Sequence, residues 1–485
     1  MEYEVVVVGG GIGGLTVAAL LAARGVSVGL FERQSQGGGC VANFEFQGYK
    51  FEPTSGLYTG WEPGGIHERI FSELPMQPPE VHRLSPAYLV RFPDHTDIEV
   101  TEQPEKLEEN LRRTFPECAD AAVSFYRELD QVARTWIEEN DHPRRFQSSS
   151  SVRSSKLLNL ATDTAAAHFR DTSLRFQHFI DVQLQTFDLC PTDRCSYISA
   201  AITLTAPHRG MWAITGGAQT LADKLAEAIK TSGGSMRLNT PVLRLAYGAD
   251  GSAIGVDLLS GERVLATRAI ISNLTIWDTY GRLVGLSRTP ASISAQLKLL
   301  EGSGAYMLFL GMDQSAGSRL GAEHLILNDW QQDRAFEPES NRLMFAAAPE
   351  WDPRAPEGKR AVTVWTHADV ADWFAFHHDE TAHEEQDQAT LERLWPHLHA
   401  AMPELGDGIE IIESATPRTF HEATRRKLGM VGGLCSTPAR MASQTFGTTI
   451  LPNLFLVGDT ATPGNGVDSV SRSALWVAEA IAPRR

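Results

Sequence analysis

Length, composition and charge exclude several protein classes. The chain has 485 residues, which is too long for one compact core, so we expect about three domains' worth of structure. Apolar residues make up 42 % and charged residues 21 %, which excludes a disordered or fibrous protein. Lys and Arg total 43 against 60 Asp and Glu, giving a net charge of −17 that repels phosphate backbones. We therefore predict no nucleic acid partner.

The N-terminus and the cysteines predict a cytoplasmic protein. Residues 1–4 lead directly into an apolar strand without a basic segment or a cleavage site, so we predict no signal peptide. No apolar run approaches the 18 residues of a membrane span, although peripheral membrane contact stays open. Because the cysteines are odd in number and lack CxxC or zinc-knuckle spacing, we expect reduced thiols. They are Cys40, Cys118, Cys190, Cys195 and Cys435. The oligomeric state stays open too.

The first 32 residues have the pattern of a dinucleotide-binding unit. Its parts are a strand at 4–8, the glycines Gly9, Gly11 and Gly14, a helix at 15–24, a strand at 26–31 and Glu32. In such a unit the first glycine makes a tight turn, the second lets the backbone approach a pyrophosphate, and the third lets the helix pack closely on the strand. The helix N-terminus offers free N–H groups to the phosphates. The acid accepts hydrogen bonds from ribose hydroxyls and repels a 2′-phosphate.

Neighbouring residues of this unit complete the predicted contacts and favour FAD over NAD. Ile12 and Gly13 in the glycine motif, and Arg33 beside the acid, are further predicted cofactor-binding residues. A second glycine cluster with Gly38 and Gly39 follows, which lets the backbone pass close to the diphosphate and the flavin-side ribose. An ordinary glycine-rich loop is the alternative interpretation. No second GxGxxG is present for a separate nicotinamide nucleotide. Ser55 and Gly56, a short way further along the chain, are also predicted to bind the cofactor.

A C-terminal segment supplies a further part of the predicted cofactor site. A buried strand at 454–457 is followed by Gly458 and Asp459, and Asp459 is placed to bond a ribityl hydroxyl or to bridge a phosphate through water. Gly466 opens space beside a flat ring. The N–H of Val467, at the start of the next helix, can face the flavin carbonyl O2. A strand, turn and helix that only complete the fold are the alternative.

A midchain segment is predicted to cover the adenine end of the cofactor. Residues 216–230 indicate a glycine turn followed by a helix, and strands are predicted at 236–246 and 255–259. Val242 is the candidate for backbone contact with adenine. Residues 269–273 then predict a strand that returns to the cofactor domain.

Together these segments resemble the phytoene desaturase and carotenoid isomerase flavoproteins, within the wider amine-oxidase-like superfamily. The resemblance spans nearly the whole chain. It is carried by residues 9–14, Glu32 with Gly38 and Gly39, and residues 212–221, 352–359, 416–419 and 458–468, with Phe115-Pro116-Glu117 and Phe125-Tyr126-Arg127 similar to the isomerase branch. Desaturases and amine oxidases usually have Arg directly after the second glycine pair. Here Cys40 follows Gly39, which is closer to the isomerase and retinol saturase branches.

The resemblance implies an α/β fold with a discontinuous Rossmann-type FAD-binding domain and an inserted α+β substrate domain. The FAD-binding domain would comprise 1–75, 206–290 and 421–485, and the substrate domain 76–205 and 291–420. A small apolar substrate would lie in a tunnel ending at the flavin, with hydride exchanged between a substrate C–H and flavin N5. Helices are indicated around 104–140 and 381–402, and a solvated Ser-rich loop at 147–155.

Several competing interpretations remain open. An amine or amino-acid oxidase of the same fold would need an aromatic cage at the flavin. A non-catalytic carrier of prenylated proteins would be expected to lose the glycine motif, which is intact. Covalent flavin attachment to Cys435 is a further alternative. No catalytic side chain is singled out by the sequence. We predict no metal site, and we assign packing or surface roles to the histidines and aromatic residues of one cluster: His367, His377, His378, His383, Trp365, Trp373, Phe374 and Phe376.

Overall fold

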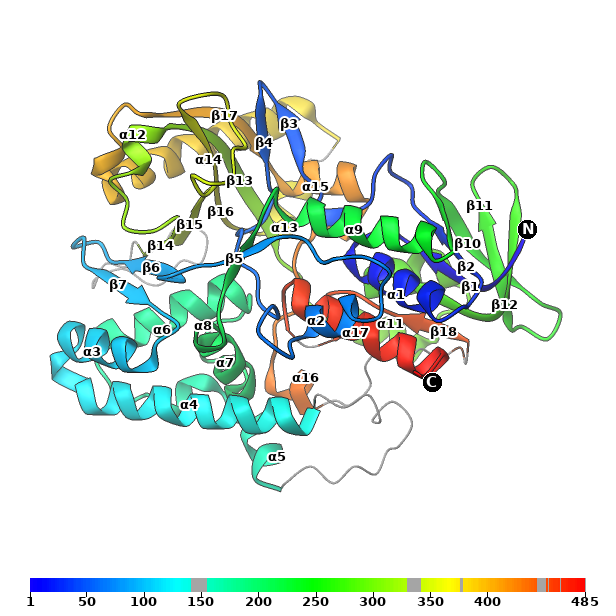
Figure 1. The fold of residues 1–485 in the computed structure, drawn as a ribbon, viewed down its shortest axis with the longest axis horizontal. Helices are drawn as coiled ribbons and strands as arrows, with labels where there is room; N and C mark the ends of the chain where they lie inside the picture. Colours follow the sequence, from blue (N-terminus) through cyan, green and yellow to red (C-terminus); the bar gives the residue numbers. More distant parts are fainter. Residues whose placement is uncertain are drawn as a thin grey trace.

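The protein is built around two seven-stranded sheets, as shown by a computed structural model (Figure 1). It describes residues 1–140, 155–328, 342–375, 378–442, 451, 453–462 and 464–484. The first sheet and its helices, here called the cofactor half, lie beside both chain termini, and the second sheet lies next to it (Figure 1). The predicted Ser-rich loop lies outside the described residues except for Ser155, where helix α5 begins.

The first sheet has the strand order β10-β11-β12-β1-β2-β9, with β18 paired to β12. Its strands are β1 (Glu2–Val8), β2 (Val28–Phe31), β9 (Ser235–Arg237), β10 (Val242–Tyr247), β11 (Ala253–Leu258), β12 (Arg263–Ser272) and β18 (Leu454–Leu456). β1 pairs in parallel with both β2 and β12, so it is central and covered on both faces. The run of valines from Val5 to Val8 is accordingly buried.

Helices cover one face of the first sheet, and on the other face its own β10–β11 hairpin and a π-helical turn (η5, Thr279–Gly285) pack against the central strands. The covering helices are α1 (Ile12–Ala23), α2 (Ile66–Phe71), α9 (Ala218–Thr231) and α17 (Val467–Ile481). α1 begins at Ile12, three residues before the predicted start, because the glycines at 13 and 14 are themselves helical. The N-terminus of α1 is thereby placed directly at the glycine turn.

The second sheet has the order β17-β13-β16-β15-β14-β6-β7. Its strands are β6 (Tyr88–Arg91), β7 (Asp97–Val100), β13 (Gly304–Asp313), β14 (His324–Asn328), β15 (Arg342–Ala347), β16 (Lys359–Ala368) and β17 (Ile409–Ala415). Helix α14 (Glu380–Ala401), close to the predicted 381–402, packs on one face. This sheet and the helices on both its faces are here called the substrate half.

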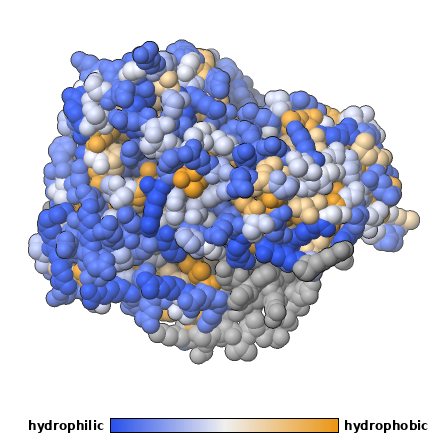
Figure 2. All heavy atoms as spheres, in the orientation of Figure 1, coloured by the Kyte–Doolittle hydropathy of each residue, from blue (hydrophilic) through white to orange (hydrophobic). Residues whose placement is uncertain are grey.

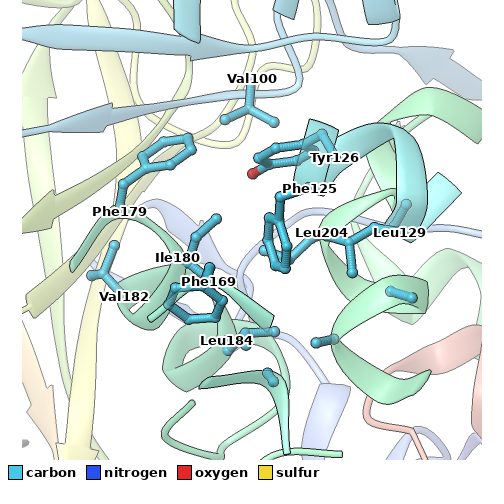
Figure 3. Close-up of a cluster of buried hydrophobic side chains, with 14 of the residues drawn as sticks. Val100, Phe125, Tyr126, Leu129, Phe169, Phe179, Ile180, Val182, Leu184 and Leu204 are labelled. Atoms are coloured by element: carbon cyan, nitrogen blue, oxygen red, sulfur yellow. The ribbon is translucent and has the colours of Figure 1, made fainter. Parts of the chain in front are cut away.

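A helical layer covers the other face of the second sheet with a dense aromatic core. Its helices are α3 (Pro104–Thr114), α4 (Ala119–Asn140), α6 (Leu174–Phe187) and α7 (Tyr197–Leu204). Figure 3 shows side chains of α4 and α6, such as Phe125 and Phe179, meeting Val100 of β7. The single helical pattern predicted over 104–140 is broken at Phe115-Pro116, because the residue before a proline is pushed out of helical geometry.

The shorter elements connect these layers. The strands are β3 (Phe44–Phe46) paired with β4 (Tyr49–Phe51), and β5 (Val81–Arg83) paired with β8 (Trp212–Ile214). The helices are α5 (Ser155–Thr162), α8 (Ala206–Arg209), α10 (Ile276–Asp278), α11 (Ala291–Leu299), α12 (Gln314–Gly317), α13 (Val370–Phe374), α15 (Pro417–Thr424) and α16 (Pro438–Ala442). The 3-10 turns are η1 (Gly39–Val41), η2 (Pro116–Cys118), η4 (Ala165–His168), η6 (Pro403–Leu405) and η7 (Lys427–Gly429).

The surface differs between the two halves of the molecule. On the face shown in Figure 2, hydrophilic side chains dominate over the substrate half, whereas apolar side chains are more frequent over the cofactor half. Two exposed leucines of that half are Leu243 on β10 and Leu259 after β11, and both border the cavity described below. In the described part of the chain, no helix has both the length and the apolar character needed to cross a membrane.

One disulfide corrects the expectation of fully reduced thiols. Cys190, after α6, and Cys435, before α16, form a disulfide with Cα atoms 5.0 Å apart, whereas Cys40, Cys118 and Cys195 are free. The two partners are 245 residues apart in sequence, so their spacing gave no signal of the pairing. Because its sulfur is in the disulfide, Cys435 is not available for covalent attachment of a flavin.

Candidate functional site

One cavity of about 1980 Å³ runs from the glycine loops of the cofactor half into the substrate half. Most of the predicted cofactor-binding residues line it, although they come from segments far apart in the chain. The lining members are Gly9, Gly11, Ile12, Gly13, Glu32, Arg33, Gly38, Gly39, Ser55, Val242, Gly458, Asp459, Gly466 and Val467.

The glycines of three segments approach one another too closely for side chains. A Cβ on Gly39 would lie 3.1 Å from the Cα of Gly11, and a Cβ on Gly13 would lie 3.2 Å from the backbone N of Gly458. Asn273, at the end of β12, lies among them, since its amide atoms would be 2.7 Å from a Cβ on Gly11. The predicted glycines therefore form a cradle of backbone, and Asn273 is a wall residue that the sequence did not reveal.

Two predicted site residues do not line the cavity. A Cβ on Gly14 would lie 2.0 Å from the carbonyl oxygen of Gly9, so this glycine serves the close packing of α1 on its preceding turn. Gly56 has φ +68° and faces the ring of buried His324, 3.1 Å from the position of a Cβ. The turn thus carries Gly56 away from the cavity while Ser55 stays on the wall, and a contact of Gly56 with the cofactor stays a prediction.

The carboxylate of Glu32 is fixed by backbone hydrogen bonds. The N–H of Gly10 donates to one oxygen at 2.6 Å and the N–H of Gln34 donates to the other at 2.7 Å. A carboxylate oxygen can accept more than one hydrogen bond, so each keeps acceptor capacity toward the cavity. The ribose role of Glu32 stays a prediction, with the side chain held in place for it.

Asp459 forms an ion pair with Arg426, a residue that the sequence analysis did not single out. The guanidinium Nη2 lies 2.8 Å from one carboxylate oxygen, and both side chains line the cavity. Burial alone would lower the pKa of Arg426, but the Asp459 carboxylate raises it above its ordinary value. Burial in turn raises the pKa of the Cys40 thiol. At neutral pH the arginine is therefore charged and the thiol is protonated.

Buried polar atoms at the start of α17 lack partners among the described residues. They are the hydroxyl of Thr462 and both amide atoms of Asn465, and both residues line the cavity. A buried polar atom without a hydrogen bond is costly, so such atoms indicate a bound group. A flavin ring system with carbonyl and N–H groups fits this place, and the backbone cradle fits a diphosphate. The site therefore fits FAD.

The part of the cavity inside the substrate half is lined mainly by apolar side chains and is here called the apolar arm. Its residues are Leu57, Trp136, Ile137, Phe187, Leu189, Ile202, Ala206, Met211 and Met441. They come from α4, α6, α7, α8, α16 and three loop positions, at residues 57, 189 and 211. Charged residues border the arm, among them Arg209, which donates to the carbonyl of Ile202 at 3.1 Å and thereby caps α7.

The histidine cluster divides between the cavity wall, the interior and the surface. His367 lines the cavity, but its Nε2 lies 3.1 Å from the carbonyl of Gln185 and its Nδ1 bonds the hydroxyl of Ser303. His383 bonds the hydroxyl of Thr416, and His378 is exposed. His377 and Phe376 lie outside the described residues. Of the aromatic residues, Trp365 lines the cavity whereas Trp373 belongs to the core and Phe374 packs against it. Within the described ranges, no group of three or more potential ligands is arranged for a metal ion.

A buried ionic network joins the two halves beside the cavity. We call it the joint network, and it consists of Glu52, Tyr58, Asp352 and Arg354. Arg354 pairs with Glu52 at 2.9 Å and with Asp352 at 3.0 Å. Glu52 also accepts from the N–H of Ala218 at 2.7 Å and from the Tyr58 hydroxyl. The loop between β15 and β16 is thus tied to the cofactor half, and Tyr58 is fixed on the cavity wall.

A largely parallel sheet whose glycine turns form a backbone cradle, opening into a larger apolar space, is typical of a flavin-dependent oxidoreductase. The chain belongs to the family of flavin containing amine oxidoreductases, whose profile matches residues 12–482. The family resemblance and the discontinuous α/β fold predicted from the sequence are confirmed, and FAD is the cofactor.

Curated relatives cover nearly the whole chain at low identity. Prolycopene isomerase 1 of an Oncidium hybrid cultivar is 25 % identical over 99 % of this chain and 84 % of its own length. All-trans-retinol 13,14-reductase of Danio rerio is 25 % identical over 94 % of this chain and 82 % of its own. The zeta-carotene-forming phytoene desaturase of Myxococcus xanthus is 26 % identical over 98 % and 93 %.

Solved structures share the fold. An oxidoreductase from Methanosarcina mazei superposes with a TM-score of 0.65 at 18 % identity, covering 99 % of this chain and 100 % of its own. Cyclohexylamine oxidase from Brevibacterium oxydans gives a TM-score of 0.64 at 17 % identity, with 99 % of each chain covered. At these identities the similarity concerns the fold alone.

Proposed function

We propose that this FAD-dependent oxidoreductase acts on a long apolar polyene of the carotenoid type, by desaturation, saturation or cis–trans isomerisation. The observation that carries the proposal is the continuity of one cavity from the glycine cradle into the apolar arm. Ligand pockets commonly measure about 300–1,000 Å³, so 1980 Å³ leaves room for a second large molecule beside a dinucleotide.

The residues of the arm match an apolar substrate. Trp136, Phe187, Ile202 and Met211 present ring, methyl and thioether groups, and a hydrocarbon chain gains about 0.8 kcal/mol for each buried CH₂. The relatives, which include a carotenoid isomerase, a desaturase and a retinol reductase, support the same substrate class.

The chemistry divides between cofactor and protein. Bound FAD supplies hydride or electron exchange with a substrate carbon. The chain's own residues would hold the polyene in a fixed direction, because the arm is enclosed by helices on the substrate half. Its apolar walls would also exclude water, which protects a reactive intermediate.

The experiment that tests the proposal uses the FAD-loaded protein under anaerobic conditions. The protein is mixed with carotenoid and retinoid polyenes in two samples, one with oxidised flavin and one photoreduced, while flavin absorbance and product composition are followed. Oxidation of the reduced flavin by a polyene supports saturation, and isomer formation without net redox supports isomerisation. Reduction of the oxidised flavin by a polyene supports desaturation.

An amine oxidase is the competing function that the same experiment addresses. Amines would reduce the oxidised flavin and release peroxide when oxygen is admitted, whereas polyenes would cause no change in flavin or product. That pair of results would overturn the proposal and leave the FAD-dependent class intact.

A further inference from the structure

A closed ring of contacts surrounds the N-terminus of α1, where the cofactor's diphosphate is expected. Gly11 meets Gly39, and Gly13 meets Gly458, at the distances given above. Cys40 follows Gly39 and lies beside Arg426. Arg426 then bonds Asp459, which follows Gly458, and this closes the ring. Among the described residues, Arg426 supplies the ring's formal positive charge and Asp459 its formal negative charge.

The guanidinium of Arg426 is held in one orientation. Its two terminal nitrogens meet the two oxygens of Asp459 at 2.8 and 3.3 Å, which is a fork-to-fork arrangement. Its Nε donates to the carbonyl of Met430 at 2.6 Å, and Nη2 also donates to the carbonyl of Gly432 at 3.1 Å. The two side chains are only 16 % and 18 % exposed, so the pair is weakly screened by solvent.

The pair decides the charge that a diphosphate would meet. An isolated Asp459 carboxylate on this wall would repel a group that carries two negative charges, whereas the ion pair is nearly neutral. The positive end of the α1 dipole would then dominate the ring. Arg33 and Arg282 do not pair with Asp459, since they donate to the backbone carbonyls of Ala423 and Arg425, respectively.

We infer that Arg426 is a further cofactor-binding residue, which neutralises Asp459 and holds its carboxylate for the ribityl and diphosphate part of FAD. The inference rests on FAD binding at this site, and it assigns unequal consequences to the loss of the two members of one ion pair. Loss of the cation leaves a bare carboxylate beside the diphosphate. Loss of the anion leaves a cation there.

The test measures the dissociation constant of FAD for apo-protein by quenching of flavin fluorescence. We expect Arg426→Gln to raise Kd about 100-fold, because removing one partner of a buried pair leaves the other uncompensated. Asp459→Asn should change Kd by less than about fivefold, because the cation left beside the diphosphate offsets the hydrogen bonds that the carboxylate loses. The double variant should bind FAD more tightly than Arg426→Gln alone. Arg418→Gln, which removes the same charge from a pair with Glu380 outside the cavity, is the matched control.

A second readout separates charge from folding. ADP carries a diphosphate and adenosine does not, so Arg426→Gln should weaken ADP binding while adenosine binding stays within about twofold. Arg426→Lys keeps the charge and loses the fork, so its Kd for FAD and for ADP should lie between the values of wild type and Arg426→Gln. It replaces the glutamine variant in this test if that variant does not fold. Equal losses for Arg426→Gln and Asp459→Asn, or equal losses for ADP and adenosine, would overturn the inference. A wild-type protein that binds no FAD would instead overturn the cofactor assignment itself.

Discussion

The two ends of the cavity are built from different material. In the cofactor half the wall is largely backbone, and glycines approach to distances at which a Cβ would collide. In the substrate half the wall is made of side chains from five helices and from loops, backed by the aromatic core of Figure 3. A backbone cradle tolerates few residue types, whereas an apolar wall can be made by many combinations of similar volume. Substitutions in the cradle should therefore impair the protein, whereas many apolar substitutions in the arm should be tolerated.

Substitution in the joint network between the halves should have the largest effect, which is a loss in the free energy of unfolding. Arg354→Met would leave the buried carboxylates of Glu52 and Asp352 without their cation, and we expect a loss of about 3–5 kcal/mol in the free energy of unfolding. Urea denaturation measures it. Arg112→Met is the control, because the pair of Arg112 with Asp120 is exposed and should contribute less than about 1 kcal/mol. Similar losses for both variants would show that the joint network does not hold the halves together.

Substitution in the backbone cradle should have the next largest effect, on both stability and FAD binding. Gly14→Ala places a methyl group 2.0 Å from the carbonyl oxygen of Gly9, so α1 must shift. We expect about 3 kcal/mol of strain and a Kd for FAD raised about 100-fold. Gly281→Ala has no atom within 4 Å of the new methyl and should behave as wild type. If both variants bound FAD equally, close packing at Gly14 would not be what positions the cradle.

A smaller effect should appear as a dependence of stability on pH. Burial lowers the pKa of His324, beside the joint network, to about 3, with Arg354 and Arg360 adding to the effect. Above its ordinary pKa of about 6.5 this histidine is neutral in both states. Below that pKa the histidine is protonated in the unfolded chain but stays neutral in the folded protein, so the free energy of unfolding falls as pH falls. The loss at pH 5 is about 2 kcal/mol.

The measurement for this histidine compares unfolding free energies at pH 7 and pH 5. In His324→Gln the fall between the two pH values should be smaller by that amount, because glutamine does not titrate. An unchanged difference would mean that the histidine is protonated in the folded protein.

The features that the sequence predicted share one property, which is that each lies within a short segment. The glycine turns, the first sheet's central strand and helix α9 could all be predicted because their signals are spacing and periodicity over fewer than about 20 residues. The sequence could not show that Ser55 lines the cavity while Gly56 faces His324, because the turn between them has no signal in the sequence.

The features that the sequence missed depend on which distant segments meet. Arg426 and Asn273 have no motif of their own and acquire a role only where α1, β12 and the Gly458 turn converge. The Cys190–Cys435 disulfide and the joint network likewise connect parts separated by more than 150 residues. The residues of the apolar arm gave no signal either, since they are spread over several helices and loops and share no motif.

The most direct test of one cavity serving two ligands is to fill the arm without touching the cradle. Ile202→Trp adds a large ring to the arm, far in sequence from the glycine turns, and the FAD-loaded variant is compared with wild type by polyene-induced changes in flavin absorbance. The account predicts stoichiometric FAD in both proteins, and a flavin response to the polyene in wild type only. A variant whose flavin still responds to the polyene with unchanged affinity would contradict it.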